Sequence, residues 1–260
     1  MEKSFNEYKQ FVKVNKCVDK TTGVEYLFTV IKKEISKSER IVPVLELTCD
    51  GDYSKVTSLY DYMIDKDILF GVNAGIFNTG TNEPDCVVVK NKKVLFDRLE
   101  TYVHKNDNDG EEKRNVMYIL GIKENGDLKM YEPSWSGEQI VEDGCVDAVM
   151  AFVPLIIDYK EFEKSDEIVC FGSYLDKQRQ VIGQLDNGDY YVLTVLEPGL
   201  TFKQTRRLLL ELGVPFAYAL DNGSSTQTML HKERLTPVYR HETGRRIPTI
   251  LLFEVKKTGV

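Results

Sequence analysis

The residues best suited to chemistry lie at 219–228, where an apolar run ends in a carboxylate and then in small hydroxylated residues. Residues 216–220 have the character of a short buried strand, and such a strand carries the next side chain to the rim of a sheet. Asp221 would lie at that rim as a catalytic carboxylate. Asn222 and Gly223 allow a tight turn with positive φ. The backbone N–H groups and hydroxyls that follow would surround a concavity suited to an anion, at Ser224, Ser225 and Thr226.

A plain loop is the alternative for this stretch, because the same Asp-Asn-Gly tripeptide occurs at 186–188. That copy lies between two β-rich runs, 180–183 and 190–195, where Asn-Gly tolerates the positive φ of a type I′ hairpin turn. After Gly223, however, five consecutive polar residues follow, which is more than a two-residue turn requires. The sequence therefore predicts a hairpin at 186–188 and leaves both a functional and a plain loop open at 221–228.

Three further groups contain residue types that bind ligands. Asn73 ends a predicted strand and supplies a donor and an acceptor, and the small residues at 74 and 75 would let a ligand or another strand approach the backbone. Arg179 opens a strand and offers a rigid fork of donors that suits a phosphate. Arg245 and Arg246 precede the last strand, and only one of two neighbouring side chains would face the site. The structural alternatives are a glycine bulge, an exposed strand-end arginine and a solvated surface charge.

The other titratable residues show no metal-ligand spacing. The histidines are expected on the surface, at His104, His231 and His241. The five cysteines include no C-x-x-C pair, which indicates a reducing compartment, and most of them lie in apolar, strand-like surroundings that favour buried, inert thiols. Three acids near predicted strand ends are candidates to assist Asp221, and the sequence does not choose among them: Glu83, Asp85 and Glu197.

The chain has 260 residues and a formal net charge of −7. This acidic balance argues against nonspecific nucleic-acid binding, because that affinity depends on clustered Lys and Arg. Local arginines can still recognise one anionic ligand. The N-terminus lacks the apolar core of a signal peptide, and no apolar run approaches membrane-spanning length. We therefore expect a protein without an export signal, cytoplasmic as synthesised and not inserted into a membrane, that can enter a particle assembled inside the cell.

Strand patterns dominate and predict an α+β fold, with a twisted, mixed but largely antiparallel sheet core flanked by a few helices. No linker, repeat or low-complexity segment appears, so we expect a single domain over 1–260. Asn125-Gly126 predicts a second hairpin, and the polar interval 105–114 is expected to be a loop. Strands are expected at 26–31, 41–47, 69–73, 86–89, 116–122, 148–157, 180–184, 190–196, 216–220 and 247–255.

Two helices are predicted from apolar spacing. The first has Val56, Leu59, Tyr60 and Met63 on one face. The second repeats that spacing over 205–212, with Thr201 and Gln204 placed as a capping box and Gly213 as a stop. Because the second helix leads into the strand that ends at Asp221, its packing would fix the position of that carboxylate.

Taken in order, these motifs resemble the phosphodiester glycosidase family. The stretch 73–77 is similar to the family's Asn-Gly-Gly-Phe-Phe, and 179–183 to its Arg-Thr-Ala-Ile-Gly. Leu200-Thr201 matches the Gly-Leu-Thr before a helix that ends in Leu-Gly. The stretch 220–226 resembles Leu-Asp-Gly-Gly-Gly-Ser-Ser, and 244–246 fits the arginine before the last strand. The resemblance spans about residues 40–255. The departures from the family pattern are Ala74, Asn222 and Ser224 in place of glycines, and Lys177-Gln178 where a histidine or proline often precedes the arginine.

The resemblance implies hydrolysis of a glycosyl phosphodiester, with a sugar on one side of the phosphate and an alcohol on the other. Asp221 would activate water or stabilise an oxocarbenium-like centre, with a second acid, Glu197 or Asp85, completing the pair. Arg179 would neutralise the departing phosphate. No cofactor is required, although a calcium or magnesium ion is compatible with the site. The implied substrate-binding residues are Asn73, Gly75, Asn78, Asn222, Gly223, Ser224, Ser225, Thr226, Arg245 and Arg246.

The implied partner is a phosphorylated or phosphodiester-linked glycan. Similar domains occur in bacterial wall-associated proteins and in bacteriophage tail or baseplate proteins, so the expected target is a wall polymer such as a teichoic acid or a capsule. The missing signal peptide fits the phage setting, where other virion proteins would be neighbours. Two alternatives stay open. One is a noncatalytic glycan-binding or structural virion module with the same fold, favoured by the substitutions at 222 and 224. The other, a metal-dependent phosphodiesterase, lacks clustered His and Asp ligands.

Overall fold

The computed structural model describes residues 5–97, 102–105, 112–115, 117–162, 175–238 and 242–257. The predictions for Cys170, for His241 and for the side chain of His104 lie outside the described residues. Within the described ranges, no helix is both long enough and apolar enough to span a membrane.

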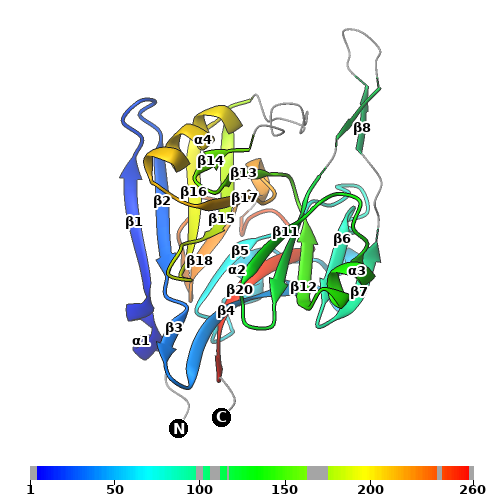
Figure 1. The fold of residues 1–260 in the computed structure, drawn as a ribbon, viewed down its shortest axis with the longest axis horizontal. Coiled ribbons are helices and arrows are strands. Elements are labelled where there is room, and N and C mark those ends of the chain that lie inside the picture. Colours follow the sequence, from blue (N-terminus) through cyan, green and yellow to red (C-terminus); the bar gives the residue numbers. More distant parts are fainter. Residues whose placement is uncertain are drawn as a thin grey trace.

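The strands form three sheets and a two-stranded ribbon (Figure 1). The seven-stranded sheet has the order β1 (Val12–Val18), β2 (Glu25–Ile31), β16 (Tyr190–Leu200), β15 (Lys177–Gln184), β17 (Phe216–Ala219), β13 (Pro154–Ile157), β14 (Lys160–Glu161). The six-stranded sheet has the order β19 (Glu233–Arg234), β18 (Thr228–Leu230), β5 (Phe70–Asn73), β20 (Thr249–Lys257), β4 (Glu39–Leu47), β3 (Glu34–Ser36). The five-stranded sheet has the order β11 (Leu128–Tyr131), β10 (Ile119–Lys123), β12 (Cys145–Met150), β6 (Val87–Lys90), β7 (Lys93–Asp97). The ribbon pairs β8 (Tyr102–Lys105) with β9 (Glu112–Asn115).

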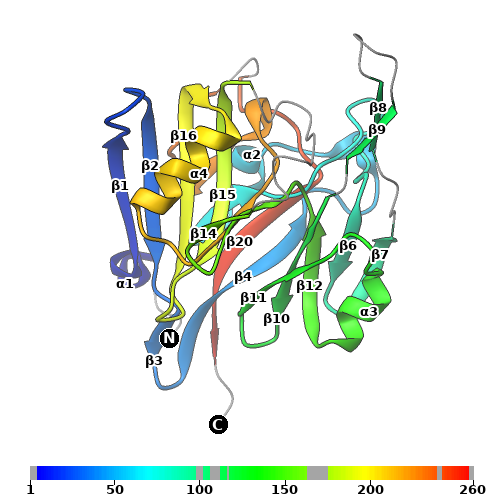
Figure 2. The ribbon, with the colours of Figure 1, turned by 45° about the horizontal axis from the view of Figure 1, so that its top comes forward.

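Four short helices accompany the sheets in the described parts: α1 (Phe5–Tyr8), α2 (Leu59–Met63), α3 (Gly137–Glu142) and α4 (Phe202–Glu211). Figure 2 shows α4 over the seven-stranded sheet on one side and α3 beside the five-stranded sheet on the other, with β20 and β4 between them. Every strand pair in the described ranges is antiparallel. The predicted α+β fold with largely antiparallel sheets is confirmed.

The seven-stranded and six-stranded sheets share one buried core. Tyr190 of β16 packs edge-to-face on Phe253 of β20, with ring centroids 5.6 Å apart. Phe253 in turn meets the ring of Phe70 on β5 at 5.6 Å. Between the same sheets the hydroxyls of Thr194 and Thr228 lie 2.9 Å apart, so a polar contact also joins the layers. This packing fixes the end of β5 relative to β15 and β17.

Both predicted hairpins and the second predicted helix are confirmed. β15 and β16 join through Gly188 and β10 and β11 through Gly126, each glycine with φ of 85°. α4 begins after Thr201, whose side chain accepts from the N–H of Gln204, and the Gln204 side chain accepts from the Thr201 N–H. This capping box satisfies two N–H groups that a helix start would otherwise leave unpaired.

Three predictions about the elements are wrong. The run 148–157 is not one strand: it breaks at 151–153, where Phe152 donates to the carbonyl of Ala219, and the chain passes from the five-stranded to the seven-stranded sheet. The first helix begins only at Leu59, because Ser58 caps it and Val56 lies before that cap. The interval 105–114 is not entirely loop, since its described residues belong to β8 and β9.

Candidate functional site

The segment after β17 is held between two strands that come from different parts of the chain. The N–H of Leu220 donates to the carbonyl of Gln180 on β15 at 2.9 Å. The next N–H, that of Asp221, donates to the carbonyl of Ala74, just beyond β5, also at 2.9 Å. The structure therefore brings the sequence motifs around 73, 180 and 221 together at one place.

Asn73 clamps the segment 221–227 at both of its ends. Its side-chain Nδ2 donates to the carbonyl of Asp221 at 2.7 Å, and its Oδ1 accepts from the N–H of Gln227 at 3.0 Å. Asn73 is only 1% exposed, so these main-chain groups, rather than solvent, surround its amide. The geometry gives Asn73 a positioning role, and its contact with a sugar hydroxyl stays a prediction.

The turn at 222–224 needs glycine at one position. Gly223 has φ of 63°, in the left-handed region, whereas Asn222 is extended with φ of −124°. The side chain of Asn222 turns inward, and its Oδ1 accepts from the N–H of Gln180 at 3.1 Å. Ser224 follows Gly223 inside a 3-10 turn without a positive φ. Asn222 and Ser224 therefore replace glycines without straining this backbone.

Asp221 as a whole residue is partly exposed, and its carboxyl group is strongly influenced by its surroundings. Burial raises its pKa above the ordinary value. A hydrogen bond from Ser225, another from the N–H of Asn222 at 2.8 Å, and the charges of Arg245 and Lys177 act in the opposite direction but do not cancel the effect. An aspartate with a raised pKa is a stronger base than an exposed one.

Arg245 places a guanidinium beside this loop. Its Nη1 lies 3.1 Å from the hydroxyl of Ser224 and 3.2 Å from that of Ser225, and both oxygens accept. The guanidinium carbon also lies 5.0 Å from the ring centroid of Phe77. Arg246 is exposed instead, as expected for neighbouring residues in an extended segment. Arg245 therefore binds the loop that begins at Asp221, and its charge acts to lower the pKa of that carboxyl group.

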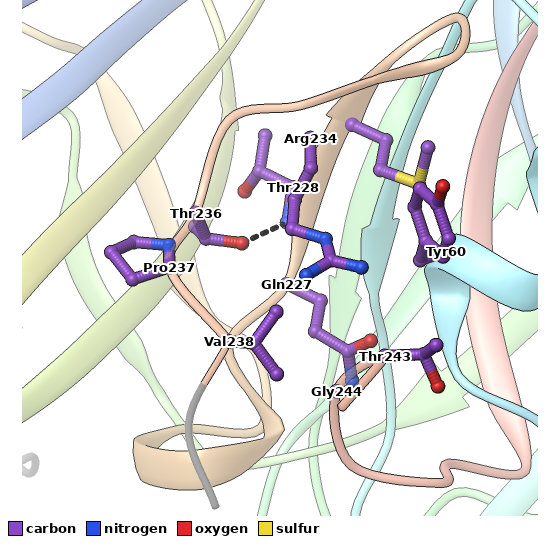
Figure 3. A pocket seen from close by; sticks show the side chains of 10 residues that line it. Tyr60, Gln227, Thr228, Arg234, Thr236, Pro237, Val238, Thr243 and Gly244 are labelled. Carbon is purple, nitrogen blue, oxygen red and sulfur yellow. Dashed lines mark hydrogen bonds between the residues drawn. The ribbon is translucent and has the colours of Figure 1, made fainter. Parts of the chain in front are cut away.

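The side chain of Gln227 holds the main chain of Arg245 against the start of α2. Its Nε2 donates to the Arg245 carbonyl at 2.8 Å, and its Oε1 accepts from the N–H of Leu59 at the start of α2 at 3.0 Å. Gln227 also borders a small pocket between α2 and β18, where the guanidinium of Arg234 lies 4.2 Å from the ring centroid of Tyr60 (Figure 3). The turn that carries Arg245 is therefore tied to the core through one amide side chain.

Lys177 is the residue at this place that sequence reasoning did not select. It begins β15 and is half-buried, and its Cδ lies 3.7 Å from where a Cβ on Gly223 would be. Burial and the charge of Arg179 lower the pKa of its ammonium, while Asp221 raises it. The available signal was the departure from the family motif at 177, which introduces a cation two residues before Arg179.

Arg179 lies inside the protein. It is 1% exposed, its Nε donates to the carbonyl of Leu200 at 2.6 Å and its Nη2 to the carbonyl of Leu175 at 2.5 Å. The guanidinium carbon lies 4.4 Å from the ring centroid of Phe202. Direct contact with a phosphate stays a prediction for Arg179. The contacts seen here hold the start of α4 against β15.

The remaining predicted residues lie around the loop rather than in it. Gly75 is buried, and a Cβ there would lie 2.6 Å from Val149, so another strand and not a ligand occupies that space. Asn78 is exposed, and its Oδ1 accepts from the N–H groups of its own turn. Asp85 is partly exposed beside Ile76, and Glu197 is exposed where β16 departs from regular pairing with β15.

Two buried polar atoms of the loop have no hydrogen-bond partner in the described residues: Nδ2 of Asn222 and Oγ1 of Thr226. Leaving such an atom unpaired costs about 1–3 kcal/mol. An ordered water or a polar group of a ligand entering the loop would satisfy them.

A metal site does not fit this loop well. Among the described residues no three His, Cys, Asp or Glu side chains gather closely enough to hold an ion. Asp221 has Lys177 and Arg245 as its neighbours, and their positive charges would repel a divalent cation. That no cofactor is required, and that a calcium or magnesium ion is compatible with the site, both stay predictions.

Comparisons with known proteins identify the family and the fold. A family model described as phosphodiester glycosidase matches residues 66–254. Among solved structures, the catalytic domain of the zebrafish N-acetylglucosamine-1-phosphodiester alpha-N-acetylglucosaminidase, auto-inhibited by its pro-peptide, superposes with a TM-score of 0.64 at 17% identity, covering 93% of this chain and 81% of that one. A hypothetical protein from Synechocystis gives a TM-score of 0.66 at 13% identity over 94% of this chain and 62% of that one. A putative exported protein from Burkholderia pseudomallei gives 0.60 at 10% identity, covering 88% and 74%. No curated protein matches the chain.

Proposed function

Because this chain belongs to the phosphodiester glycosidase family, we propose that it hydrolyses glycosyl phosphodiesters in a glycan or wall polymer. The bond that breaks joins the anomeric carbon of a sugar to a phosphate oxygen. The family model covers the segments that carry Asn73, Asp221 and Arg245, which the fold brings to one place.

One observation carries the proposal: the guanidinium of Arg245 donates to Ser225 in the loop that begins at Asp221, so that a cation lies near the carboxylate. A glycosyl phosphodiester has an electrophilic carbon next to a phosphate anion. The reaction therefore needs a base and a cation that are close together yet do not neutralise each other completely. The carboxylate of Asp221, whose pKa is raised, and an arginine bound to the same loop meet that need.

In this mechanism Asp221 accepts a proton from a water molecule as the water oxygen attacks the anomeric carbon. The bond from that carbon to the phosphate oxygen breaks, and its electron pair leaves with the phosphate monoester. A phosphate leaves readily without strong protonation, so the main demand on the protein is stabilisation of the growing negative charge. Arg245 supplies this through charge-assisted hydrogen bonds. Which acid assists Asp221, Glu197 or Asp85, stays a prediction.

The loop geometry supports turnover over a purely binding module. The substitutions at 222 and 224 do not change the turn, because only Gly223 adopts a left-handed φ. The side chain of Asn222 points inward to the N–H of Gln180, so it does not cover the outer side of the turn. The unpartnered Asn222 and Thr226 atoms supply further polar groups for a bound molecule or its water.

The name of the zebrafish relative, N-acetylglucosamine-1-phosphodiester alpha-N-acetylglucosaminidase, suggests the first sugar to test. At 17% identity that relative shares the fold, and the sugar is part of the proposal. A phosphodiester-linked wall polymer as the natural target, and a phage tail or bacterial envelope as the setting, stay predictions from the sequence.

Isotopic water tests the proposed bond cleavage. The purified protein is incubated in ¹⁸O-labelled water with the methyl phosphodiester of N-acetylglucosamine 1-phosphate, and both products are analysed by mass spectrometry. The proposal predicts ¹⁸O at the anomeric hydroxyl of the released sugar. Label in the phosphate would instead show cleavage of the P–O bond, and a ligand that stays bound but uncleaved would identify a binding module.

A further inference from the structure

A small pocket lies next to the turn that carries Arg245, and the proposed reaction does not use it. It lies between α2, β18 and β19, and Gln227 and Gly244 are among the residues that line it. Gly244 directly precedes Arg245, and the Nε2 of Gln227 donates to the Arg245 carbonyl at 2.8 Å. The pocket therefore borders the candidate site.

The side chain of Arg234 on β19 points into this pocket. Figure 3 shows its guanidinium among the side chains of Tyr60, Gln227 and Val238. The guanidinium carbon lies 4.2 Å from the ring centroid of Tyr60, so the ring covers one face of the planar group. Within the described residues, this guanidinium forms no hydrogen bond and no ion pair. Because Arg234 is partly exposed, its N–H donors can bind an acceptor that arrives from solvent.

The other walls of the pocket combine apolar surface with a hydroxyl group. Met229, Pro237 and Val238 supply the apolar surface, which lowers the local dielectric and strengthens a charged hydrogen bond. The hydroxyl of Thr236 accepts from the N–H of Thr228 at 3.1 Å, and its own proton is not used in that bond. A guanidinium, a hydroxyl and apolar walls together suit an oxyanion.

Two acidic residues near the pocket, Asp61 and Glu233, do not pair with Arg234 in the described structure. The Oδ2 of Asp61 accepts from the hydroxyl of Ser58 at 2.9 Å and from that of Thr243 at 2.7 Å. Glu233 is exposed, and neighbouring residues of a strand point to opposite faces. The guanidinium of Arg234 therefore keeps its donors for a ligand.

The proposed substrate can supply an anion for this pocket. A polymer of sugars joined by phosphodiesters carries a phosphate in every repeat. When one phosphate lies at Arg245, the phosphate of the adjoining repeat is one sugar unit away along the polymer. The planar fork of a guanidinium matches two oxygens of such a phosphate.

We propose that Arg234 and Thr236 bind a second phosphate group of a polymeric substrate, so that the protein prefers phosphodiester-linked polymers to a single sugar phosphodiester. This inference rests on the proposed function, since it names the substrate class of that same site. The phosphate next to the bond that breaks stays at Arg245, and the pocket takes the phosphate of the neighbouring repeat.

The test measures binding separately from hydrolysis, with three ligands that carry a CH₂ group in place of each anomeric oxygen and so release no sugar. The first is the analogue of the methyl phosphodiester of N-acetylglucosamine 1-phosphate, with one charged phosphorus group. The second is extended by another N-acetylglucosamine 1-phosphate unit and has two charged groups. The third has the length of the second, but its added phosphorus group is methylated to a neutral ester. Calorimetry gives the Kd of each ligand for the full chain.

The variants are Arg234→Met, which keeps an unbranched side chain on Tyr60 without the charge, and Arg234→Lys. Lys232→Met is the matched control, because Lys232 is an exposed lysine in the same β18–β19 turn and does not line the pocket. Thermal unfolding verifies that each variant is folded.

We expect the wild type to bind the doubly charged ligand about tenfold or more tightly than either of the other two. Arg234→Met should lose this preference, Arg234→Lys should keep part of it, and Lys232→Met should keep all of it. The inference is overturned if the wild type shows no preference or binds none of the ligands, if a folded Arg234→Met keeps the preference, or if Lys232→Met loses it to the same extent.

Hydrolysis assays with the oxygen-linked forms of the first two ligands separate this inference from the proposed function. A wild type that shows the Arg234-dependent preference in binding but releases no sugar contradicts the function and supports the phosphate pocket. A wild type that hydrolyses both substrates, with the same ratio of their KM values in Arg234→Met, supports the function and contradicts the phosphate pocket.

Discussion

The side-chain amide of Asn73 donates a hydrogen bond to the main-chain carbonyl of Asp221 across 2.7 Å, joining residues 148 positions apart in the sequence. The same amide accepts from the N–H of Gln227, so one side chain closes the loop that carries the carboxylate. The position of Asp221 therefore depends on β5 as much as on β17, its own strand.

Replacing Asn73 should loosen this loop. Asn73→Ala leaves the buried N–H of Gln227 and the carbonyl of Asp221 without these partners, and we expect a loss of about 2–4 kcal/mol in the free energy of unfolding, measured in urea. Asn78→Ala is the control, because Asn78 is exposed and water can replace its bonds, so its change should stay within about 0.5 kcal/mol. Equal stability of the two variants would show that Asn73 does not clamp the loop.

Gly75 should tolerate no side chain. In Gly75→Ala the new Cβ would lie 2.6 Å from a methyl of Val149 and 3.0 Å from the carbonyl oxygen of Met150, and we expect a loss of about 1–3 kcal/mol. Gly80→Ala provides the comparison, since Gly80 is exposed and the nearest atom belongs to the flexible side chain of Asn78. The same urea titration measures both. If Gly75→Ala is as stable as Gly80→Ala, the packing described at this strand end is wrong.

Much of the fold could be predicted from the sequence because its signals are local. Asn-Gly turns, the capping box of Thr201 and Gln204, and apolar strand runs each depend on a few neighbouring residues. The break at 151–153 could not be predicted in this way. Its cause is a pairing of Phe152 with Ala219, more than sixty residues away in the printed sequence, which local apolar patterning does not contain.

The candidate site also has features that the sequence predicts and features that it does not. Its motif residues Asn73, Asp221 and Arg245 meet as their order along the chain indicated. Burial was not visible in the sequence, because an arginine at a strand start looks the same whether it points to solvent or to the core. Arg179 is buried against the ring of Phe202, whereas the side chain of Lys177 lies beside Gly223. Helix α3 was not predicted, although the residues of its capping box, Ser136 and Gln139, indicate a helix start.

The raised pKa of Asp221 predicts how stability depends on pH. The pKa of this carboxyl group is higher in the folded than in the unfolded state. Its contribution to stability is therefore fully present below the unfolded pKa, about 3.9, and is lost as the pH rises through the folded pKa. Asp221→Asn does not titrate. The free energy of unfolding of the wild type should therefore fall relative to that of Asp221→Asn as the pH rises, measured in urea from pH 3 to 8.

A flat difference between wild type and Asp221→Asn over that range would mean that burial does not raise the pKa of Asp221. A wild type that gains on the variant with rising pH would mean that Lys177 and Arg245 outweigh burial and lower it. Ser38→Ala, in an exposed turn far along the chain, controls for the effect of substitution itself.

The second acid can be identified by two matched substitutions. Asp85→Asn and Glu197→Gln each remove one charge with little change in shape, and both residues have solvent exposure, so both variants should fold. If one acid assists Asp221, its variant should lose about 100-fold or more in kcat and the high-pH or low-pH limb of the rate profile should shift. The other variant should keep the wild-type profile. Full activity in both variants would leave Asp221 to act with neither.

In the proposed hydrolysis of a glycosyl phosphodiester, Asp221 serves as the base. The most direct measurement is the rate of sugar release from the methyl phosphodiester of N-acetylglucosamine 1-phosphate by the wild type and by folded Asp221→Asn. We predict steady release by the wild type and a rate lower by about 100-fold or more in the variant. Equal rates in the two proteins would contradict it, as would a wild type that binds the phosphodiester and never releases the sugar.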